Sequence, residues 1–442
     1  TQRGGASVQS GRPRRLSRHL GYFTGGQCND RRTQGRFLLV GRARRRITAR
    51  AVVAGSMSRH ALRRTQAWSA AAEQSGLLNG DPGIRSGDAD GFLVTSLTHV
   101  RYLTGFSGSN AALILTDGAA ILITDGRYVT QAGVEAPDVE IMLSRNVMGG
   151  FVDFVRAQPG RQQWWCEADH LSAGEWLVLG AEDRLSMLPL KGAVESARLI
   201  KDDEEMAHIR HACQISSTAF MEVIARVQPG WTERDLAAAL EFQMRHNGAD
   251  GAAFDTIVAA GDHSAQPHHR PTDRPIQLGD LVVVDWGAKV NGYHSDQTRT
   301  LVMGAARDWQ HELLTLVRSS QQTALTLLER HFSAGPGPES FPEVNLSVAT
   351  CDVDRAARQV IVDAGFGEYF VHGIGHGVGL EIHEAPMMGA TSEGMLLCGS
   401  PVTVEPGVYL AGQGGVRWED LVVATRNGLE TLTQAPQDCA FQ

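Results

Sequence analysis

The segment LVVVDWGAKVNGYHSDQTRT, residues 281–300, is the most informative stretch of this chain. An apolar run ends at the carboxylate of Asp285, an Asn-Gly turn follows, and a second run contains Asp296. Asn-Gly between two such runs predicts a two-residue β-hairpin. With Val290 paired to Tyr293, Asp285 lies opposite Thr298, and the two aspartates fall on one face as diagonal neighbours.

The closeness of the two aspartates has two possible explanations. Like charges at this separation repel, and burying them unpaired is costly or neutralises one of them. A bound cation removes that cost, and Gly287 between them leaves room for a metal. A solvated hairpin face explains an aspartate pair equally well, so this hairpin alone leaves both explanations open.

A second hairpin favours the metal. The runs VTVEPG, residues 402–407, and VRWED, residues 416–420, flank a glycine-rich turn. A register centred near Gly412 sets Glu405 across from Glu419, provided that Pro406 does not shift the pairing. Two hairpins that each present facing carboxylates from apolar strands predict a metal centre.

The stretch HGIGHGVGLEIHEAP, residues 372–386, supplies imidazoles between the two hairpins. Its glycines oppose a helix and allow close backbone approach to a bound group. One histidine beside four carboxylates is a plausible metal ligand, which leaves two for proton transfer or hydrogen bonding. Such a set can hold two divalent ions, which suits Mn²⁺ or Co²⁺ and permits Zn²⁺, and hydrolysis is the natural reaction class.

Composition restricts the function classes. The net charge of −8 combines +12 in residues 1–56, from thirteen Arg and one Asp, with −20 in the remainder. An acidic body opposes nucleic-acid binding, and no apolar run of eighteen residues could span a membrane. Six scattered cysteines without a C-x-x-C pair predict reduced thiols in the cytoplasm. We interpret residues 1–56 as a basic, disordered or non-native leader.

The remaining chain divides into two domains. Residues 57–198 alternate short strands and helices, including a hairpin at Asp117-Gly118, and predict a three-layer α/β domain. In residues 199–442, helices are predicted from Asp202 to about Pro229, from Thr232 to about Asn247, from about Asp308 to His331 and again near Asp352, with a loop over 333–342.

Over about residues 90–430 the chain resembles the pita-bread metallopeptidases of the Xaa-Pro dipeptidase and aminopeptidase P branch. The resemblance rests on VVDWG, GYHSDQTRT, TVEPGVY and GVRWED, and on RYLTGFSGSN and DGRY for a creatinase-like N-terminal domain. It implies an α+β fold with a pita-bread catalytic domain. The metal ligands it implies are Asp285, Asp296, His376, Glu405 and Glu419. The catalytic residues it implies are His268, His372, His383, Glu405 and Arg417. His268 is aligned with the family histidine in preference to its neighbour His269.

The same resemblance implies a function. The chain is expected to hydrolyse Xaa-Pro bonds of peptides through a hydroxide that bridges two metals, with Mn²⁺ as the expected metal. Glu405 would take or relay the proton, and His372 or His383 would stabilise the oxyanion. The compact N-terminal domain favours a dipeptidase over aminopeptidase P, and a homodimer is implied. A non-catalytic scaffold and a creatinase-like hydrolase are the alternatives, which the complete ligand set opposes.

Overall fold

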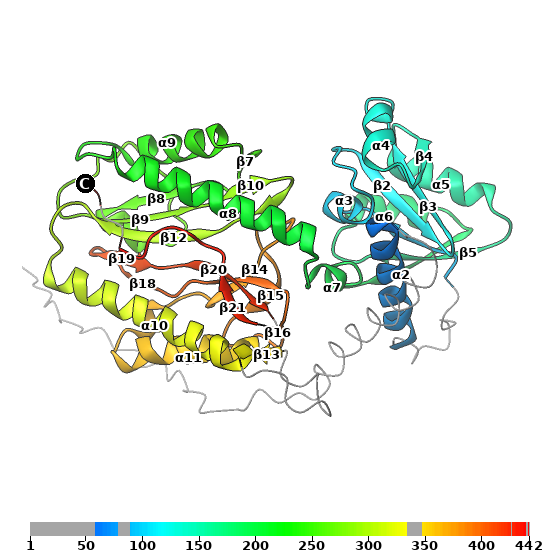
Figure 1. Cartoon of the computed structure of the whole chain (residues 1–442). Helices are drawn as coiled ribbons and strands as arrows, with labels where there is room; N and C mark the ends of the chain where they lie inside the picture. Colours follow the sequence, from blue (N-terminus) through cyan, green and yellow to red (C-terminus); the bar gives the residue numbers. More distant parts are fainter. Residues whose placement is uncertain (1–57, 78–88, 334–346, 426, 439–440, 442) are drawn as a thin grey trace, which may run out of the picture.

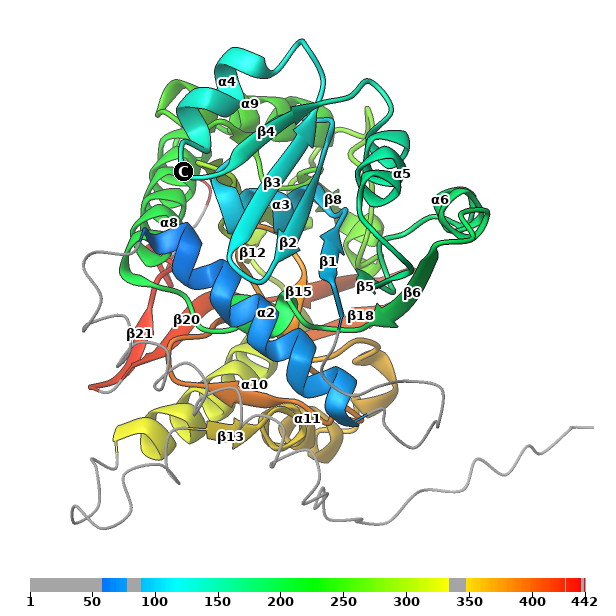
Figure 2. The ribbon, with the colours of Figure 1, turned by 90° about the vertical axis from the view of Figure 1, so that its right-hand side faces the viewer.

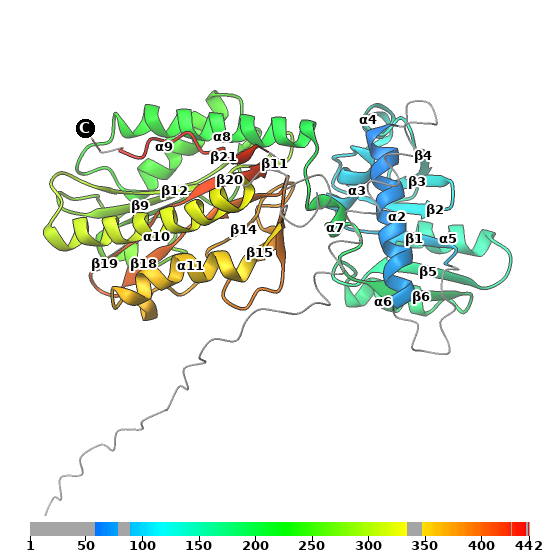
Figure 3. The ribbon, with the colours of Figure 1, turned by 60° about the horizontal axis from the view of Figure 1, so that its bottom comes forward.

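The computed structural model describes residues 58–77, 89–333, 347–425, 427–438 and 441. The predicted leader over 1–56 and most of the predicted loop over 333–342 lie outside the described residues. The chain forms two α/β domains joined through the short helix α7 (Glu195–Arg198), which lies between them (Figures 1 and 3). Among the described residues, no helix combines the length and apolar character needed to cross a lipid bilayer.

The N-terminal domain is built on a six-stranded sheet in the order β4-β3-β2-β1-β5-β6, which reads from left to right in Figure 2. The strands are β1 (Gly91–Val94), β2 (Ala111–Thr116), β3 (Ala119–Thr124), β4 (Glu140–Leu143), β5 (Gln162–Glu167) and β6 (Leu185–Leu190). The predicted hairpin at Asp117-Gly118 is confirmed, because Thr116 pairs with Ala119 across it.

Helices cover both faces of this sheet, as predicted for three layers. α2 (Arg59–Leu77), α3 (Leu97–Thr104) and α4 (Val129–Glu135) pack on one face; α5 (Val147–Ala157) and α6 (Ala173–Gly180) pack on the other. Side chains alternate between the faces along a strand, so Phe92 and Val94 join the first core and Leu93 the second.

Four long helices frame the C-terminal domain: α8 (Asp203–Ile224), α9 (Glu233–His246), α10 (Asp308–Ser333) and α11 (Thr350–Asp363). The predicted starts of α8 and α9 are confirmed by capping boxes at Asp202 and Thr232. α8 ends earlier than the predicted stop at Pro229, because the chain turns where the Arg226 N–H bonds the Val223 carbonyl.

Short strands lie between the two helix pairs (Figure 1). α8 and α9 pack on the side of β8 (Ile257–Ala260), β9 (Leu281–Trp286) and β12 (Gln297–Val302), beside β7 (Gly251–Ala252), β10 (Ala288–Val290) and β11 (Tyr293–His294). α10 and α11 pack on the side of the sheet β15-β14-β17-β20-β21. Its strands are β14 (Gly375–Gly377), β15 (Glu384–Met388), β17 (Pro401–Val404), β20 (Asp420–Thr425) and β21 (Gly428–Thr431).

A backbone bridge beside the carboxylates joins the two halves of this domain. β18 (Gly407–Leu410) and β19 (Gly414–Arg417) form a hairpin, while β13 (Ser347–Ala349) and β16 (Met395–Leu397) pair under α11. Thr298 of the first half pairs with Glu419 of the second, whose N–H donates to the Thr298 carbonyl at 3.1 Å. This junction brings the two carboxylate-bearing hairpins together.

Candidate metal centre

Strand register places the four carboxylates as the hairpins predict. Asp285 pairs with Thr298, and Val290 pairs with Tyr293, which confirms the first register. In the second hairpin, Gly407 pairs with Arg417, and the same register continues where Val404 pairs with Asp420. Pro406 therefore does not shift the pairing, and Glu405 and Glu419 lie across from each other where the two ladders meet.

The five predicted ligands come from separate elements and reach one cavity. Asp285 lies near the end of β9, Asp296 before β12, His376 on β14, Glu405 after β17 and Glu419 before β20. His376 Nε2 lies 3.6 Å from Asp296 Oδ2 and 3.4 Å from Glu405 Oε1. Ligand atoms of Asp296, His376 and Glu419 all lie within 4.8 Å of one another.

Burial and mutual repulsion disfavour the charged carboxylates. Burial raises the pKa of Asp296 well above its ordinary value, and the charges of Glu419, Asp285 and Glu405 raise it further. Burial likewise raises the pKa of Glu419, aided by Glu405 and Asp285. The pKa of Glu405 rises to about 7, chiefly through burial, although Arg417 acts in the opposite direction. Added positive charge beside Asp296, Glu405 and Glu419 would favour the ionised form of all three.

The donor atoms fit divalent cations. His376 Nδ1 contacts the Gly377 carbonyl at 3.0 Å, so this nitrogen carries the proton and the Nε2 lone pair faces two carboxylates. Asp285 Oδ1 is buried without a hydrogen-bond partner. A lone pair aimed at carboxylate oxygens, beside an unpartnered buried oxygen, is the arrangement that a cation stabilises. Four carboxylates and one imidazole are hard to borderline donors, which suit Mn²⁺, Co²⁺ or Zn²⁺.

Arg417 forms hydrogen bonds that hold the carboxylates in place. Its Nη2 donates to Asp285 Oδ2 at 2.6 Å, its Nε to Thr298 Oγ1 at 3.1 Å, and its Nη1 to Tyr409 Oη at 2.9 Å. Thr298 Oγ1 also donates to Glu419 Oε2 at 2.6 Å. One buried guanidinium thus fixes an aspartate directly and a glutamate through a hydroxyl.

Three residues of this framework were not identified in the sequence: Thr298, Thr403 and Tyr409. Thr403 Oγ1 donates to Glu405 Oε1 at 3.0 Å and accepts from the His376 N–H at 3.1 Å. Each of these residues lies two to four positions from a predicted carboxylate ligand. That closeness in sequence was the available indication that they belong to the site.

A cavity of about 640 Å³ opens beside the five residues. The predicted catalytic residues all line it, namely His268, His372, His383, Glu405 and Arg417. His269 lines it too, but its Nε2 donates to Glu233 at 2.9 Å. His383 lies against His376, with ring centroids 4.3 Å apart.

His372 is held as a neutral acceptor. Its Nδ1 contacts the Gly373 carbonyl at 2.8 Å, so Nε2, 2.9 Å from Tyr409 Oη, accepts the tyrosine proton. Burial lowers the pKa of His372 to about 4, and the charge of Arg417 acts in the same direction. In this arrangement His372 has no ring N–H directed at the cavity. The ring nitrogens of His383 are not held by hydrogen bonds of this kind.

The role expected for Gly287 is wrong. A Cβ built at Gly287 would lie 1.9 Å from the Ser295 carbonyl oxygen and 3.0 Å from Ala253 Cβ. The missing side chain therefore makes room for neighbouring backbone, not for a metal. Its effect on the centre is indirect, because it lets the strands that carry Asp285 and Asp296 approach each other.

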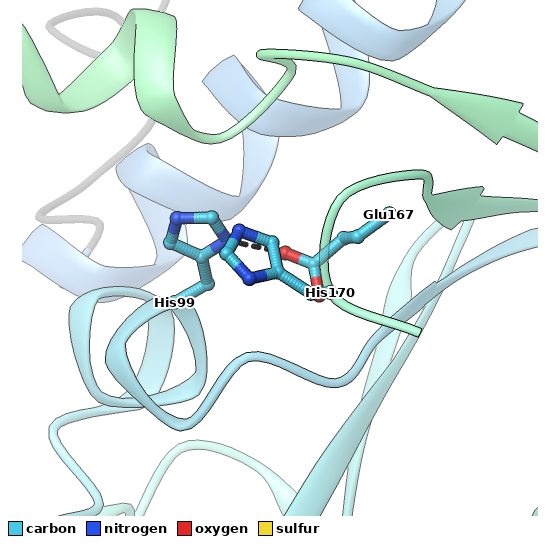
Figure 4. A group of neighbouring side chains, drawn as sticks. All are labelled: His99, Glu167 and His170. Carbon is cyan, nitrogen blue, oxygen red and sulfur yellow. Dashed lines mark hydrogen bonds and ion pairs between the residues drawn. The ribbon is translucent and has the colours of Figure 1, made fainter. Parts of the chain in front are cut away.

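Two other groups of His and Glu side chains could be mistaken for metal sites. In the N-terminal domain, ligand atoms of His99, Glu167 and His170 lie within 4.8 Å of one another (Figure 4). Glu167 accepts from the N–H groups of Thr95 and Ser96 and contacts His99 Nδ1, while His99 Nε2 points away from the carboxylate (Figure 4). We interpret this group as a structural hydrogen-bond network that fixes the start of α3.

The second group consists of Glu233, His263 and His269, of which His269 lines the cavity. Glu233 accepts from His263 Nδ1 and His269 Nε2, each at 2.9 Å, and from the Ala260 N–H at 2.8 Å. Its carboxylate therefore organises the segment that carries His268 to the cavity wall.

Comparison with known proteins agrees with this architecture. Residues 207–426 match metallopeptidase family M24, and residues 84–200 match the creatinase/prolidase N-terminal domain. An uncharacterized peptidase of Bacillus subtilis, YqhT, is 36% identical over 79% of this chain and 95% of its own length.

Solved structures share both domains. The Xaa-Pro dipeptidase from Bacillus anthracis superposes with a TM-score of 0.73 at 33% identity, covering 85% of this chain and 99% of that one. The X-Pro aminopeptidase from Thermotoga maritima superposes with a TM-score of 0.70 at 32% identity, covering 80% and 97%. The predicted creatinase-like and pita-bread domains are confirmed, and the chain belongs to metallopeptidase family M24.

Proposed function

We propose that this metallopeptidase is an Xaa-Pro dipeptidase, with two divalent cations held by Asp285, Asp296, His376, Glu405 and Glu419. The observation that carries the proposal is the convergence of these five side chains, from both halves of the C-terminal domain, at the 640 Å³ cavity. His268 and His383 also line the cavity, and imidazole groups of this kind suit a substrate with a carbonyl and a carboxylate.

The chain's own residues have separable roles in this proposal. Divalent cations at the centre supply Lewis acidity for the scissile carbonyl and make water nucleophilic near neutral pH. Glu405 accepts the proton of the attacking water. His383 donates to the developing oxyanion or to the departing nitrogen, because His372 already accepts from Tyr409. His268, which lines the same cavity, contacts the substrate in this proposal.

The substrate class follows from the relatives and from the chemistry of proline. Proline's tertiary amide has no N–H, so peptidases that need this donor handle it poorly. The Bacillus anthracis relative is described as an Xaa-Pro dipeptidase and the Thermotoga maritima relative as an X-Pro aminopeptidase. We assign the dipeptidase activity first and treat cleavage of longer peptides as the competing outcome.

We further propose Mn²⁺ as the metal, a homodimer as the assembly and the cytoplasm as the location. Oxygen-rich donors favour Mn²⁺ over metals that prefer thiolates. Cys166 and Cys213 are buried free thiols, as expected in a reducing compartment.

The test is a hydrolysis assay on protein reconstituted with Mn²⁺. Ala-Pro, Ala-Pro-Ala and Ala-Ala are compared, with Asp296→Ala as the metal-site control. Cleavage of Ala-Pro alone, lost in the control, is the expected result. Cleavage of Ala-Pro-Ala would assign an aminopeptidase instead, and no metal-dependent cleavage of either proline peptide would favour a scaffold role.

A further inference from the structure

The segment between β14 and β15, residues 378–383, lies at the junction of the two domains. Leu380 packs against the N-terminal core that contains α2 and α3 and also against a C-terminal cluster formed with Met206 and Leu421. The same segment ends at His383, which lines the cavity and lies against His376. One short loop therefore contacts both domains and the candidate metal centre.

Glu384, directly after His383, is bound by the chain that links the domains. Its carboxylate contacts Arg198 Nη2 and accepts from Lys201 Nζ at 2.5 Å. Arg198 Nη1 also lies 2.9 Å from Glu381 Oε2 in the same loop. The side chains of Arg198, Lys201 and Glu384 are only 4%, 1% and 7% exposed.

The local backbone is shaped around this carboxylate. A Cβ built at Gly379 would lie 2.4 Å from Glu384 Oε1, so glycine leaves the space that the carboxylate occupies. The Gly379 carbonyl accepts from the His294 N–H at 2.9 Å, and the Gly379 N–H donates to the Glu381 carbonyl at 3.0 Å. Buried charges are retained only where their partners are fixed, so the linker and the loop hold each other in one arrangement.

We propose that Glu384 is a positioning residue: held by Arg198 and Lys201 of the interdomain linker, it fixes the 378–383 loop and so sets the position of His383 in the cavity. The placement of the N-terminal domain is thereby coupled to the catalytic pocket. This inference rests on the proposed Xaa-Pro peptidase function for its kinetic test, but the structural coupling can be measured without turnover.

The kinetic test is Glu384→Gln, which removes the charge and keeps the size. Displacement of His383 should lower kcat/KM for Ala-Pro by about ten- to a hundredfold, while metal content stays at the wild-type value. In a His383→Ala background the same substitution should have less than about a twofold further effect, because Glu384 acts through His383.

The matched control is Arg63→Gln. Arg63 joins α2 to the start of α8, with Nη2 at 2.6 Å from Asp202 Oδ2 and 2.9 Å from Glu205 Oε2, and it is 5% exposed. It is another buried ion pair between the domains, but neither partner lies in the loop. This variant should lose stability and keep its kcat/KM. An equal loss of kcat/KM in both variants, or additive effects of Glu384→Gln and His383→Ala, would overturn the proposal.

A second variant tests the proposal if Glu384→Gln does not fold, and a second measurement tests it if the protein does not cleave Xaa-Pro peptides. Should Glu384→Gln not fold, Gly379→Ala displaces the carboxylate without changing any charge and should reproduce the kinetic loss. Should the wild-type protein not cleave Xaa-Pro peptides, the proposed function fails, but hydrogen exchange still tests the coupling. Amides of residues 379–384 should exchange faster in Glu384→Gln than in Arg63→Gln, and equal protection in the two would contradict it.

Discussion

Arg417 holds three side-chain oxygen atoms in fixed directions around the candidate metal centre. A guanidinium can do this because its N–H groups are planar and rigidly spaced, whereas an ammonium is a single point charge. The contact with Asp285 orients a proposed ligand, and the contact with Tyr409 keeps His372 as an acceptor. Charge alone does not reproduce this arrangement.

We therefore expect Arg417→Lys to weaken metal binding by about ten- to a hundredfold although the charge is conserved. Titration of the metal-free protein with Mn²⁺ in competition with a chelating dye measures the change. Arg274→Lys is the control, because Arg274 contacts both carboxylate oxygens of Asp280, which does not line the cavity. Equal affinity of wild type and Arg417→Lys would show that charge suffices.

His383 should affect turnover more than metal content. Preorganised donors to a developing oxyanion are worth about 2.7–4 kcal/mol, so His383→Ala should lower kcat by about a hundred- to a thousandfold. Metal content, measured by elemental analysis on the same sample, should remain near that of wild type. A parallel loss of metal and activity would instead give His383 a structural role.

The residues of the centre differ in how far the sequence predicts them. The four carboxylates of the proposed centre follow from their positions at strand ends and from hairpin register, which are local rules. The choice of His376 among three histidines came from the family resemblance. The acceptor state of His372 does not follow, because it depends on Tyr409 and on Arg417, which the fold brings to it. Sequence spacing identifies the groups, and tertiary contacts determine which ring nitrogen keeps a proton.

At the scale of elements, the approach of the strands around Gly287 controls the centre. A methyl group at Gly287 would collide with the Ser295 carbonyl, so we expect Gly287→Ala to cost about 1–3 kcal/mol or more of unfolding free energy and to weaken metal binding. Gly126→Ala is the control, since a Cβ there meets nothing within 4 Å. Chemical denaturation of the two variants measures the difference.

Helix starts were easier to predict than helix ends or the first helix. Asp202 and Thr232 mark starts because a side chain caps the first backbone N–H groups locally. The end of α8 was placed too late, since the hydrophobic pattern continues beyond Ile224 into residues that pack in an irregular turn. α2 was not identified at all: most of its apolar residues are alanines, and it is stabilised by packing of residues such as Ala67 and Ala71 on the sheet.

At the scale of the whole molecule, bound metal should stabilise the C-terminal domain. A ligand at a hundred times its Kd adds about 2.7 kcal/mol to the free energy of unfolding, which corresponds to about 5–10 °C in Tm for a domain of this size. Thermal unfolding with Mn²⁺ and with EDTA measures this shift. Asp296→Ala should show little metal-dependent change, and a wild-type Tm insensitive to EDTA would contradict the assignment.

The bridge between Thr298 and Glu419 has a consequence for synthesis of the chain. Asp285 and Asp296 leave the ribosome long before Glu405 and Glu419, and the ribosome adds residues at about 5–20 per second. Two of the five proposed ligands are therefore exposed for several seconds before Glu405 and Glu419 are available. A nascent chain has no complete centre in that interval, so peptidase activity cannot begin until the C-terminal hairpin has emerged and closed on the first one.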